Sequence, residues 1–210
     1  KNSYVIIEAS SFQLSHSQHI KPDFAFFLNL TNDHLDWHGT KKNYLNAKLK
    51  IFERQTKNNY AIINNQLKKS FINKKFIGKL RLPALDEYKL IKSDISNEYL
   101  KSNHNDENMS FIYTFAKLLK INKKAFIKSM NSFRGLPHRF EIFLKKKNVT
   151  FINDSKATSF KATQSALSSL KNVYLIIGGL PKKADRINFS NYKKSIIKCY
   201  IIGKHINFFK

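Results

Sequence analysis

The alternation of short apolar segments with helical patterns most constrains how this 210-residue chain can fold. Four apolar runs predict β-strands, at residues 4–7, 24–30, 60–63 and 75–77. Three helical patterns lie between or after them, at residues 40–54, 106–119 and 122–130. Strands that alternate with helices in this way predict an α/β fold with a doubly wound, mostly parallel sheet.

A second α/β domain is predicted beyond a short segment that contains Gly135 and Pro137 and interrupts the helical pattern. We place the boundary there, with a first domain at residues 1–132 and a second, incomplete and Rossmann-like domain at residues 133–210. The second domain has predicted strands at residues 139–144, 149–152 and 173–177 and a predicted helix at residues 159–170.

The formal net charge of +24 favours an anionic partner such as nucleic acid, a membrane surface or nucleotide phosphates. The lysines are scattered, however, which is typical of a solvated surface, so we expect neither a nucleic-acid partner nor insertion into a membrane. The longest apolar runs are far shorter than the ~20 residues that a bilayer span requires. A single cysteine, Cys199, excludes a disulfide within this chain and a Cys-cluster zinc site. With no signal-peptide pattern in the sequence, we expect a cytoplasmic protein.

Polar groups follow three of the predicted strands, at Glu8, at Asp33 and His34, and at Asn153 and Asp154, and open α/β sheets bind ligands at the carboxyl ends of strands. Glu8 is either a metal ligand or general base, or a carboxylate that is hydrogen-bonded to a helix N-terminus. Asp33, His34 and Asp36 lie within four residues and suit Mg²⁺, Mn²⁺ or Zn²⁺. A polar loop with a helix cap at Asp36 gives the same pattern.

Lys48 lies in the middle of the apolar face of the helix predicted at residues 40–54. At ~100° per residue, Tyr44 and Phe52 share that face, whereas Lys50 points away. Partial desolvation is expected to lower the pKa of the Lys48 amine from its ordinary value of about 10.4. The neutral amine would form either a Schiff base or, with CO₂, a carbamate that binds metal as a carboxylate does. The alternative is that the ammonium extends along the surface to reach water.

Two loops of the second domain carry groups that suit a nucleotide. Arg139 is either a bidentate phosphate clamp or the partner of Glu141 in an ion pair. In the loop after the strand at residues 149–152, Asp154 suits a ribose and Lys156 suits a phosphate, and an ordinary βα turn is the alternative. The chain contains no G-x-x-x-x-G-K-S/T phosphate-binding sequence.

Seven segments occur in a distinctive order, at residues 8–14, 29–36, 47–52, 104–108, 135–141, 153–158 and 178–179. They include the strings SSFQL, GLPHRFE and NDSKAT. This series closely resembles the Mur ligase family over nearly the whole chain. The resemblance implies a central ATP-binding domain that lacks its phosphate-binding loop, followed by a C-terminal domain that binds an amino acid and nucleotide. It implies an ATP-dependent ligase that activates a carboxylate as an acyl phosphate, which an amine then attacks.

Within the family, the resemblance is strongest to members that add D-glutamate to UDP-N-acetylmuramoyl-L-alanine, in the synthesis of a peptidoglycan precursor. It implies Glu8 and His34 as Mg²⁺ ligands and a carbamylated Lys48 that serves a second Mg²⁺ site. It also implies that Ser10 and Gln13 contact the muramoyl substrate.

The resemblance further implies residues for ATP and for D-glutamate. Those implied for ATP are Asn105 and Asn108 on the adenine side, with Arg139, Asp154 and Lys156 from the last domain. Those implied for D-glutamate are Thr158 and Lys182.

The chain begins at Lys1 and ends in an apolar run, so we expect an internal fragment of a longer protein, inactive by itself and monomeric. Two alternatives stay open. The first is another Mur or folylpolyglutamate-type ligase, which a test of dependence on D-glutamate would distinguish from the ligase described above. A basic nucleic-acid-binding module would show salt-sensitive binding to random duplex DNA.

Overall fold

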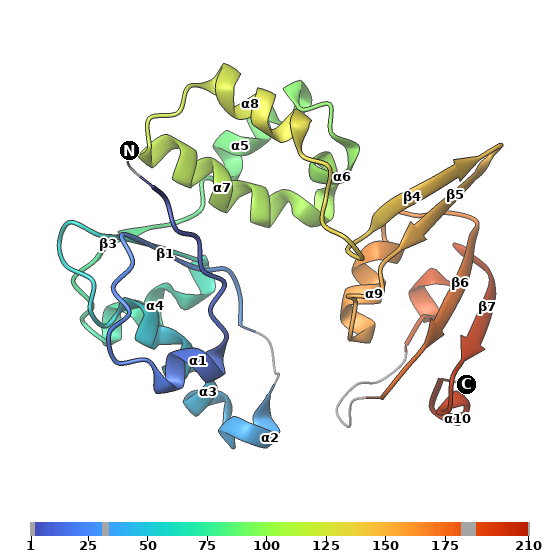
Figure 1. The fold of residues 1–210 in the computed structure, drawn as a ribbon, viewed down its shortest axis with the longest axis horizontal. Helices are drawn as coiled ribbons and strands as arrows, with labels where there is room; N and C mark the ends of the chain where they lie inside the picture. The colour runs from blue at the N-terminus through green and yellow to red at the C-terminus, as the bar shows by residue number, and fades with distance from the viewer. Residues whose placement is uncertain (1–2, 31–33, 182–187, 210) are drawn as a thin grey trace. The chain divides into compact units, whose positions relative to one another are not determined.

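Two units make up the fold, in Lys1–Ser93 with Asp106–Phe126 and in Asp94–Asn105 with Ile127–Lys210. The computed structural model describes residues 3–30, 34–181 and 188–209 (Figure 1). The predicted domain boundary after residue 132 stays a prediction.

A three-stranded parallel sheet forms the centre of the first unit, in the order β1 (Phe24–Phe27), β2 (Tyr60–Ile63) and β3 (Lys79–Arg81). In the register of this sheet, Phe24 lies opposite Tyr60 and Tyr60 lies opposite Lys79. The predicted α/β fold with a mostly parallel sheet is confirmed.

Helices cover both faces of this sheet. Successive side chains of a strand point to opposite faces, and in β1 both sets are apolar. On one face, Ala25 and Phe27 join a buried cluster with Phe52 and with residues of α3 (Lys41–Leu49) and α4 (Lys68–Asn73). On the other face, the rings of Phe24 and Phe26 lie 5.0 and 5.4 Å from that of Phe115 on α7. Figure 1 shows α3 and α4 on one side of the strands and α7, with α5 packed against it, on the other.

The remaining elements of the first unit are helical. They are α1 (Ser11–His16), α2 (Leu35–His38), η1 (Lys50–Phe52), η2 (Asn65–Leu67), α5 (Leu85–Ile91), η3 (Lys92–Asp94, whose last residue belongs to the second unit) and α7 (Asp106–Leu118). The predicted helix at residues 40–54 corresponds to α3 and η1. Thr40 caps α3, because its side-chain oxygen accepts a hydrogen bond of 3.1 Å from the backbone N–H of Asn43.

The second unit contains two small sheets. The strands β4 (Glu141–Lys146) and β5 (Val149–Asn153) form an antiparallel hairpin, and β6 (Val173–Gly178) pairs in parallel with β7 (Ile196–Ile202). Its helices are α6 (Glu98–Lys101), η4 (Asn103–Asn105), α9 (Phe160–Leu167), η5 (Ser190–Tyr192) and α10 (Ile206–Phe209). The helix α8 (Lys123–Ser132) begins in the first unit and ends in the second.

Two predicted strands are wrong. Residues 4–7 belong to no helix or strand, and their side chains are 68–93% exposed. In the described part of the chain no strand pairs with them, and an apolar run forms a strand only where a neighbour accepts its hydrogen bonds. The strand predicted at residues 75–77 instead begins at Lys79, because Lys75 turns the chain with a φ of 54°.

Candidate active site

Lys48 lies on α3 with its ammonium group beside two aromatic rings. Its Nζ atom is 5.4 Å from the centroid of the Phe27 ring and 5.5 Å from that of the Tyr44 ring. Both rings are buried and Lys48 is half-buried. A cation within about 6 Å of a ring centroid is attracted by the ring quadrupole. The lysine in the apolar face of this helix therefore lies against the core of the first unit.

His34 contacts one of the same rings. It is the N-cap residue of α2 and has a left-handed backbone conformation, with a φ of 55°. Its ring centroid lies 4.9 Å from that of Phe12 and 6.1 Å from that of Tyr44. Because Tyr44 also contacts Lys48, the structure brings His34 and Lys48 to a common neighbour.

Glu8 lies in the segment before α1 that forms no helix or strand, and its side chain is exposed. Asp36 is exposed on α2, and Asp33 lies outside the described residues. Within the ranges that the structure describes, no group of three or more His, Cys, Asp or Glu side chains is placed to hold a metal ion. Oxygen ligands are what Mg²⁺ prefers, and a carbamate on Lys48 would add one, so the Mg²⁺ site of Glu8, His34 and Lys48 stays a prediction.

Ser10 and Gln13 hydrogen-bond to each other in a capping box at the start of α1. The Ser10 oxygen accepts from the Gln13 backbone N–H at 3.2 Å, and the Ser10 backbone N–H donates to Gln13 Oε1 at 2.8 Å. A backbone N–H can only donate, so this bond fixes which end of the amide faces Ser10. The Gln13 amide nitrogen is therefore the end of the amide that does not take part in the Ser10 backbone bond.

His38 is a buried residue of this region that the sequence patterns do not single out. Its Nε2 atom lies 2.9 Å from Ser11 Oγ, a contact between residues 27 positions apart, and both side chains are less than 10% exposed. Burial lowers the pKa of His38, and the neighbouring charge of His34 lowers it further. The signal in the sequence is a second histidine four residues after His34, at the far end of a one-turn helix.

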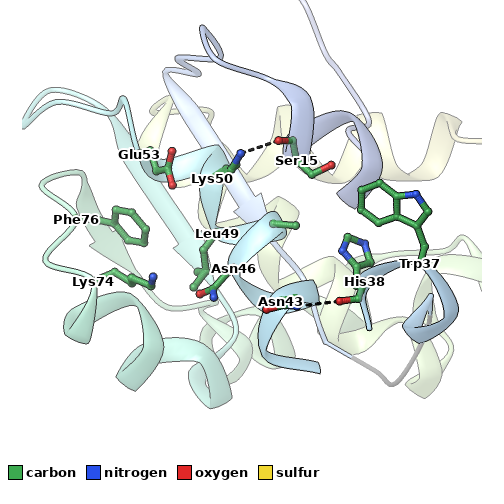
Figure 2. Close-up of a pocket in the computed structure, with 11 residues that line it drawn as sticks. Ser15, Trp37, His38, Asn43, Asn46, Leu49, Lys50, Glu53, Lys74 and Phe76 are labelled. Carbon is green, nitrogen blue, oxygen red and sulfur yellow. Dashed lines mark hydrogen bonds between the residues drawn. The ribbon is translucent and has the colours of Figure 1, made fainter. Parts of the chain in front are cut away.

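An open groove adjoins His38, with a volume of about 660 Å³ (Figure 2). Its walls include Trp37, His38 and Lys74, and Lys50 Nζ donates a hydrogen bond of 2.6 Å to the Ser15 carbonyl at its edge. None of the residues predicted for the site lines this groove.

In the second unit, hydrogen bonds join the turn before β4 to the loop after β5. Asp154 Oδ1 accepts from the Phe140 backbone N–H at 2.9 Å, and the Lys156 backbone N–H donates to the His138 carbonyl at 3.0 Å. Glu141 Oε2 accepts from the His138 backbone N–H at 2.8 Å. The two loops predicted to carry nucleotide-binding groups are thus held side by side.

Arg139, Lys156 and Thr158 are exposed around these two loops. Among the described residues Arg139 makes no ion pair with Glu141, so the structure does not support the interpretation of Arg139 as the ion-pair partner of Glu141. Burial raises the pKa of Tyr99, Arg139 lowers it, and Asp154 raises it, so both charged groups lie near the Tyr99 hydroxyl.

Three further predicted residues lie elsewhere. Asn105 is buried, and its side-chain nitrogen donates to the Tyr99 carbonyl at 2.6 Å and to Ser102 Oγ at 3.3 Å. Asn108 is exposed on α7. Lys182, predicted for D-glutamate, lies outside the described residues.

Fold and site together define an α/β protein of two units, with polar side chains gathered in loops and short helices beside its strands. Residues 1–124, more than half of the chain, match the Mur ligase middle domain, and the chain belongs to the Mur ligase family. No helix in the described ranges is long and apolar enough to cross a membrane.

Curated relatives sharpen this assignment. The UDP-N-acetylmuramoylalanine–D-glutamate ligase of Rickettsia felis is 33% identical over 97% of this chain, and that of Oenococcus oeni is 34% identical over 97%. The chain spans about half the length of these relatives, 50% in both cases.

Solved structures share the fold. The MurF ligase of Thermotoga maritima, in complex with ADP, superposes with a TM-score of 0.58 at 16% identity, over 85% of this chain and 53% of that one. MurF from Acinetobacter baumannii gives a TM-score of 0.54 at 14% identity, over 76% of this chain and 40% of that one.

Proposed function

We propose that this chain forms the central part of an ATP-dependent ligase that joins D-glutamate to UDP-N-acetylmuramoyl-L-alanine through an acyl phosphate. The observation that carries the proposal is the approach of His34 and Lys48 to the same Tyr44 ring, in a chain that is 33% identical to such a ligase. Residues 1–132 are assigned to the central ATP-binding domain and residues 133–210 to the C-terminal domain. The protein is proposed to act in the cytoplasm as a monomer.

The first unit is proposed to hold Mg²⁺ and the acceptor substrate. Glu8, His34 and a carbamylated Lys48 would hold the metal, which offsets the charge of the phosphates and of the developing acyl phosphate when bound. Ser10 and Gln13 would contact the muramoyl substrate. The orientation of the Gln13 amide supports this role, because the amide nitrogen can donate to a carbonyl, carboxylate or phosphate oxygen.

The second unit is proposed to supply further contacts to ATP, beside the central ATP-binding domain. The exposed cations Arg139 and Lys156 suit phosphate oxygens. Asp154 binds Phe140 through one carboxylate oxygen and would accept a ribose hydroxyl through the other. Asn105 uses its side-chain nitrogen inside the unit, which leaves its carbonyl oxygen to accept from the adenine amino group.

The two remaining assignments complete the substrate sites. Asn108 is proposed to lie on the adenine side with Asn105, and Thr158 and Lys182 are proposed for D-glutamate. Each step of the proposed reaction requires its two reacting groups to be held close together and correctly oriented, and these residues would supply that positioning.

Amide formation by the complete protein tests this proposal. With ATP, Mg²⁺ and UDP-N-acetylmuramoyl-L-alanine, we expect phosphate release only when D-glutamate is added. Phosphate release with another amino acid, and none with D-glutamate, would assign a different Mur or folylpolyglutamate-type ligase. Salt-sensitive DNA binding without any nucleotide-dependent reaction would replace the enzyme by a nucleic-acid-binding module.

The 210 residues alone provide a matched control. They contain no G-x-x-x-x-G-K-S/T sequence, so we expect them to hydrolyse no ATP and to form no amide. Ligation by the isolated chain would show that the phosphates are bound without such a loop.

A further inference from the structure

The helix α1 depends on other elements for its place. It has six residues, far fewer than the ~12–15 at which an isolated helix becomes even marginally stable in water. Its buried side chains are Ser11 and Leu14. Because Ser11 is polar and only 3% exposed, it requires a hydrogen-bond partner, and His38 supplies one.

The His38 ring is held by aromatic rings from three elements. Its centroid lies 4.4 Å from that of Trp37 in an edge-on contact and 5.1 Å from that of Tyr44. It also stacks on Phe12 of α1, with 5.6 Å between centroids and 29° between planes. The imidazole is therefore fixed in orientation, with Nε2 directed at Ser11.

This contact joins the two halves of the proposed site in the first unit. Ser11 lies between Ser10 and Gln13, which are assigned to the muramoyl substrate. His38 is the last residue of α2, whose N-cap is His34, and it shares the Tyr44 ring with Lys48. A shift of His38 or Ser11 would move the substrate contacts relative to the proposed metal ligands.

We propose that His38 is a positioning residue for the acceptor substrate, because its hydrogen bond to Ser11 holds the Ser10–Gln13 turn in register with His34 and Lys48. This inference rests on the proposed ligase function. It predicts that His38 governs the KM for UDP-N-acetylmuramoyl-L-alanine and leaves the KM values for ATP and D-glutamate unchanged.

Four variants of the complete protein test the inference. His38→Phe keeps an aromatic ring but loses the hydrogen bond, and Ser11→Ala removes the other partner. His38→Gln places a side-chain amide, which can also hydrogen-bond to Ser11, near the position of Nε2. His19→Phe is the matched control, because His19 is an exposed histidine outside the ring cluster.

For His38→Phe and Ser11→Ala we expect the KM for the acceptor to rise roughly tenfold. The first change leaves the buried Ser11 hydroxyl without its partner, and the second removes that hydroxyl. His38→Gln should recover part of this loss, and His19→Phe should match the wild type. The double variant His38→Phe/Ser11→Ala should be little worse than either single variant, because one bond is lost in each. A fall in kcat with no change in this KM, or an equal rise in all three KM values, would overturn the inference.

Hydrogen exchange without any substrate separates this inference from the proposed function. The backbone N–H of Leu14 donates to the Ser10 carbonyl at 3.0 Å, and we expect its exchange to become roughly tenfold faster in His38→Phe and Ser11→Ala. Unchanged exchange would overturn the positioning role even in an active ligase. A wild type that forms no amide would overturn the ligase, while faster exchange in both variants would still support the link between His38 and α1.

Discussion

In the first unit, Lys48 and His34 rest on buried aromatic rings, whereas in the second unit Asp154 and its neighbours are exposed or half-buried and are held by hydrogen bonds between two turns. The core of the first unit is closed, with Phe52 and Ile63 at 0% exposure. In the second unit many strand side chains remain open, for example Phe143 at 59% exposure.

This difference teaches that the candidate residues of the two units derive their geometry from different forces. Packing fixes Lys48 and His34 in the first unit, because close-packed rings leave a side chain few alternative positions. In the second unit, hydrogen bonds from backbone N–H groups, two of them to carboxylate side chains, hold turn residues with positive φ, at 64° for His138 and 48° for Phe140. Substitutions in the two units should therefore differ in kind as well as in size.

The largest effect is expected at Lys48. Lys48→Ala removes the amine that would carry the carbamate, so ligation by the complete protein should fall by roughly 10³-fold or more. Added formate or acetate should restore part of the activity by supplying a carboxylate. Lys41→Ala, at an exposed position on the same helix, is the control. Full activity of Lys48→Ala would remove this residue from the mechanism.

The next largest effect concerns the closed core. Phe52→Ala should lower the free energy of unfolding of the first unit by about 3–5 kcal/mol, because it opens a cavity where Phe52 contacts Phe71 and Phe27. Phe143→Ala in the second unit should cost less than about 1 kcal/mol, since that ring is largely exposed. Urea unfolding followed through Trp37 fluorescence and through hydrogen exchange of β4 checks both values. Equal losses would break the contrast between the two units.

An intermediate effect is expected at alkaline pH from Tyr88 in the first unit. Burial, with a smaller contribution from Asp106, raises the pKa of Tyr88 to about 12. Between pH 10 and 12 the unfolded chain loses this proton while the folded unit keeps it, so stability that is complete below pH 10 declines across that range. The decline should be roughly 1–3 kcal/mol.

Tyr88→Phe isolates this contribution. The Tyr88 hydroxyl is fully buried and has no hydrogen-bond partner among the described residues, so its removal should not destabilise the unit at pH 7. The variant should also lose the part of the alkaline decline that Tyr88 causes. An identical pH profile in variant and wild type would show that other groups cause the decline.

The sequence patterns predict well the central strand and the longest helix of the first unit. The apolar run at residues 60–63 coincides with β2, a central strand that is covered on both faces. The helix predicted at residues 106–119 corresponds to α7, Asp106–Leu118. By contrast, β7 has no counterpart among the predicted strands, because Lys198 interrupts its apolar run.

Local sequence patterns carry no information about contacts between residues that are far apart in the chain. Whether residues 4–7 form a strand depends on a neighbour, and the contact of Ser11 with His38 joins positions 27 residues apart. The family resemblance predicts that His34 and Lys48 serve one site, and their shared ring, Tyr44, appears only in three dimensions. The lowered pKa of Lys48 and the roles assigned to the site residues stay predictions.

The smallest effect is expected in the second unit, at the hydrogen bond between Asp154 and Phe140. Asp154→Ala removes the acceptor of the Phe140 N–H, so exchange of that amide should become roughly tenfold faster, which corresponds to about 1.4 kcal/mol. Asp154→Asn keeps a side-chain oxygen at the same place and should retain most of the protection. The first unit should show no change in either variant. If both variants lose protection equally, the charge of Asp154 rather than its hydrogen bond holds the turn, and the contrast between packed residues in the first unit and hydrogen-bonded residues in the second would be wrong.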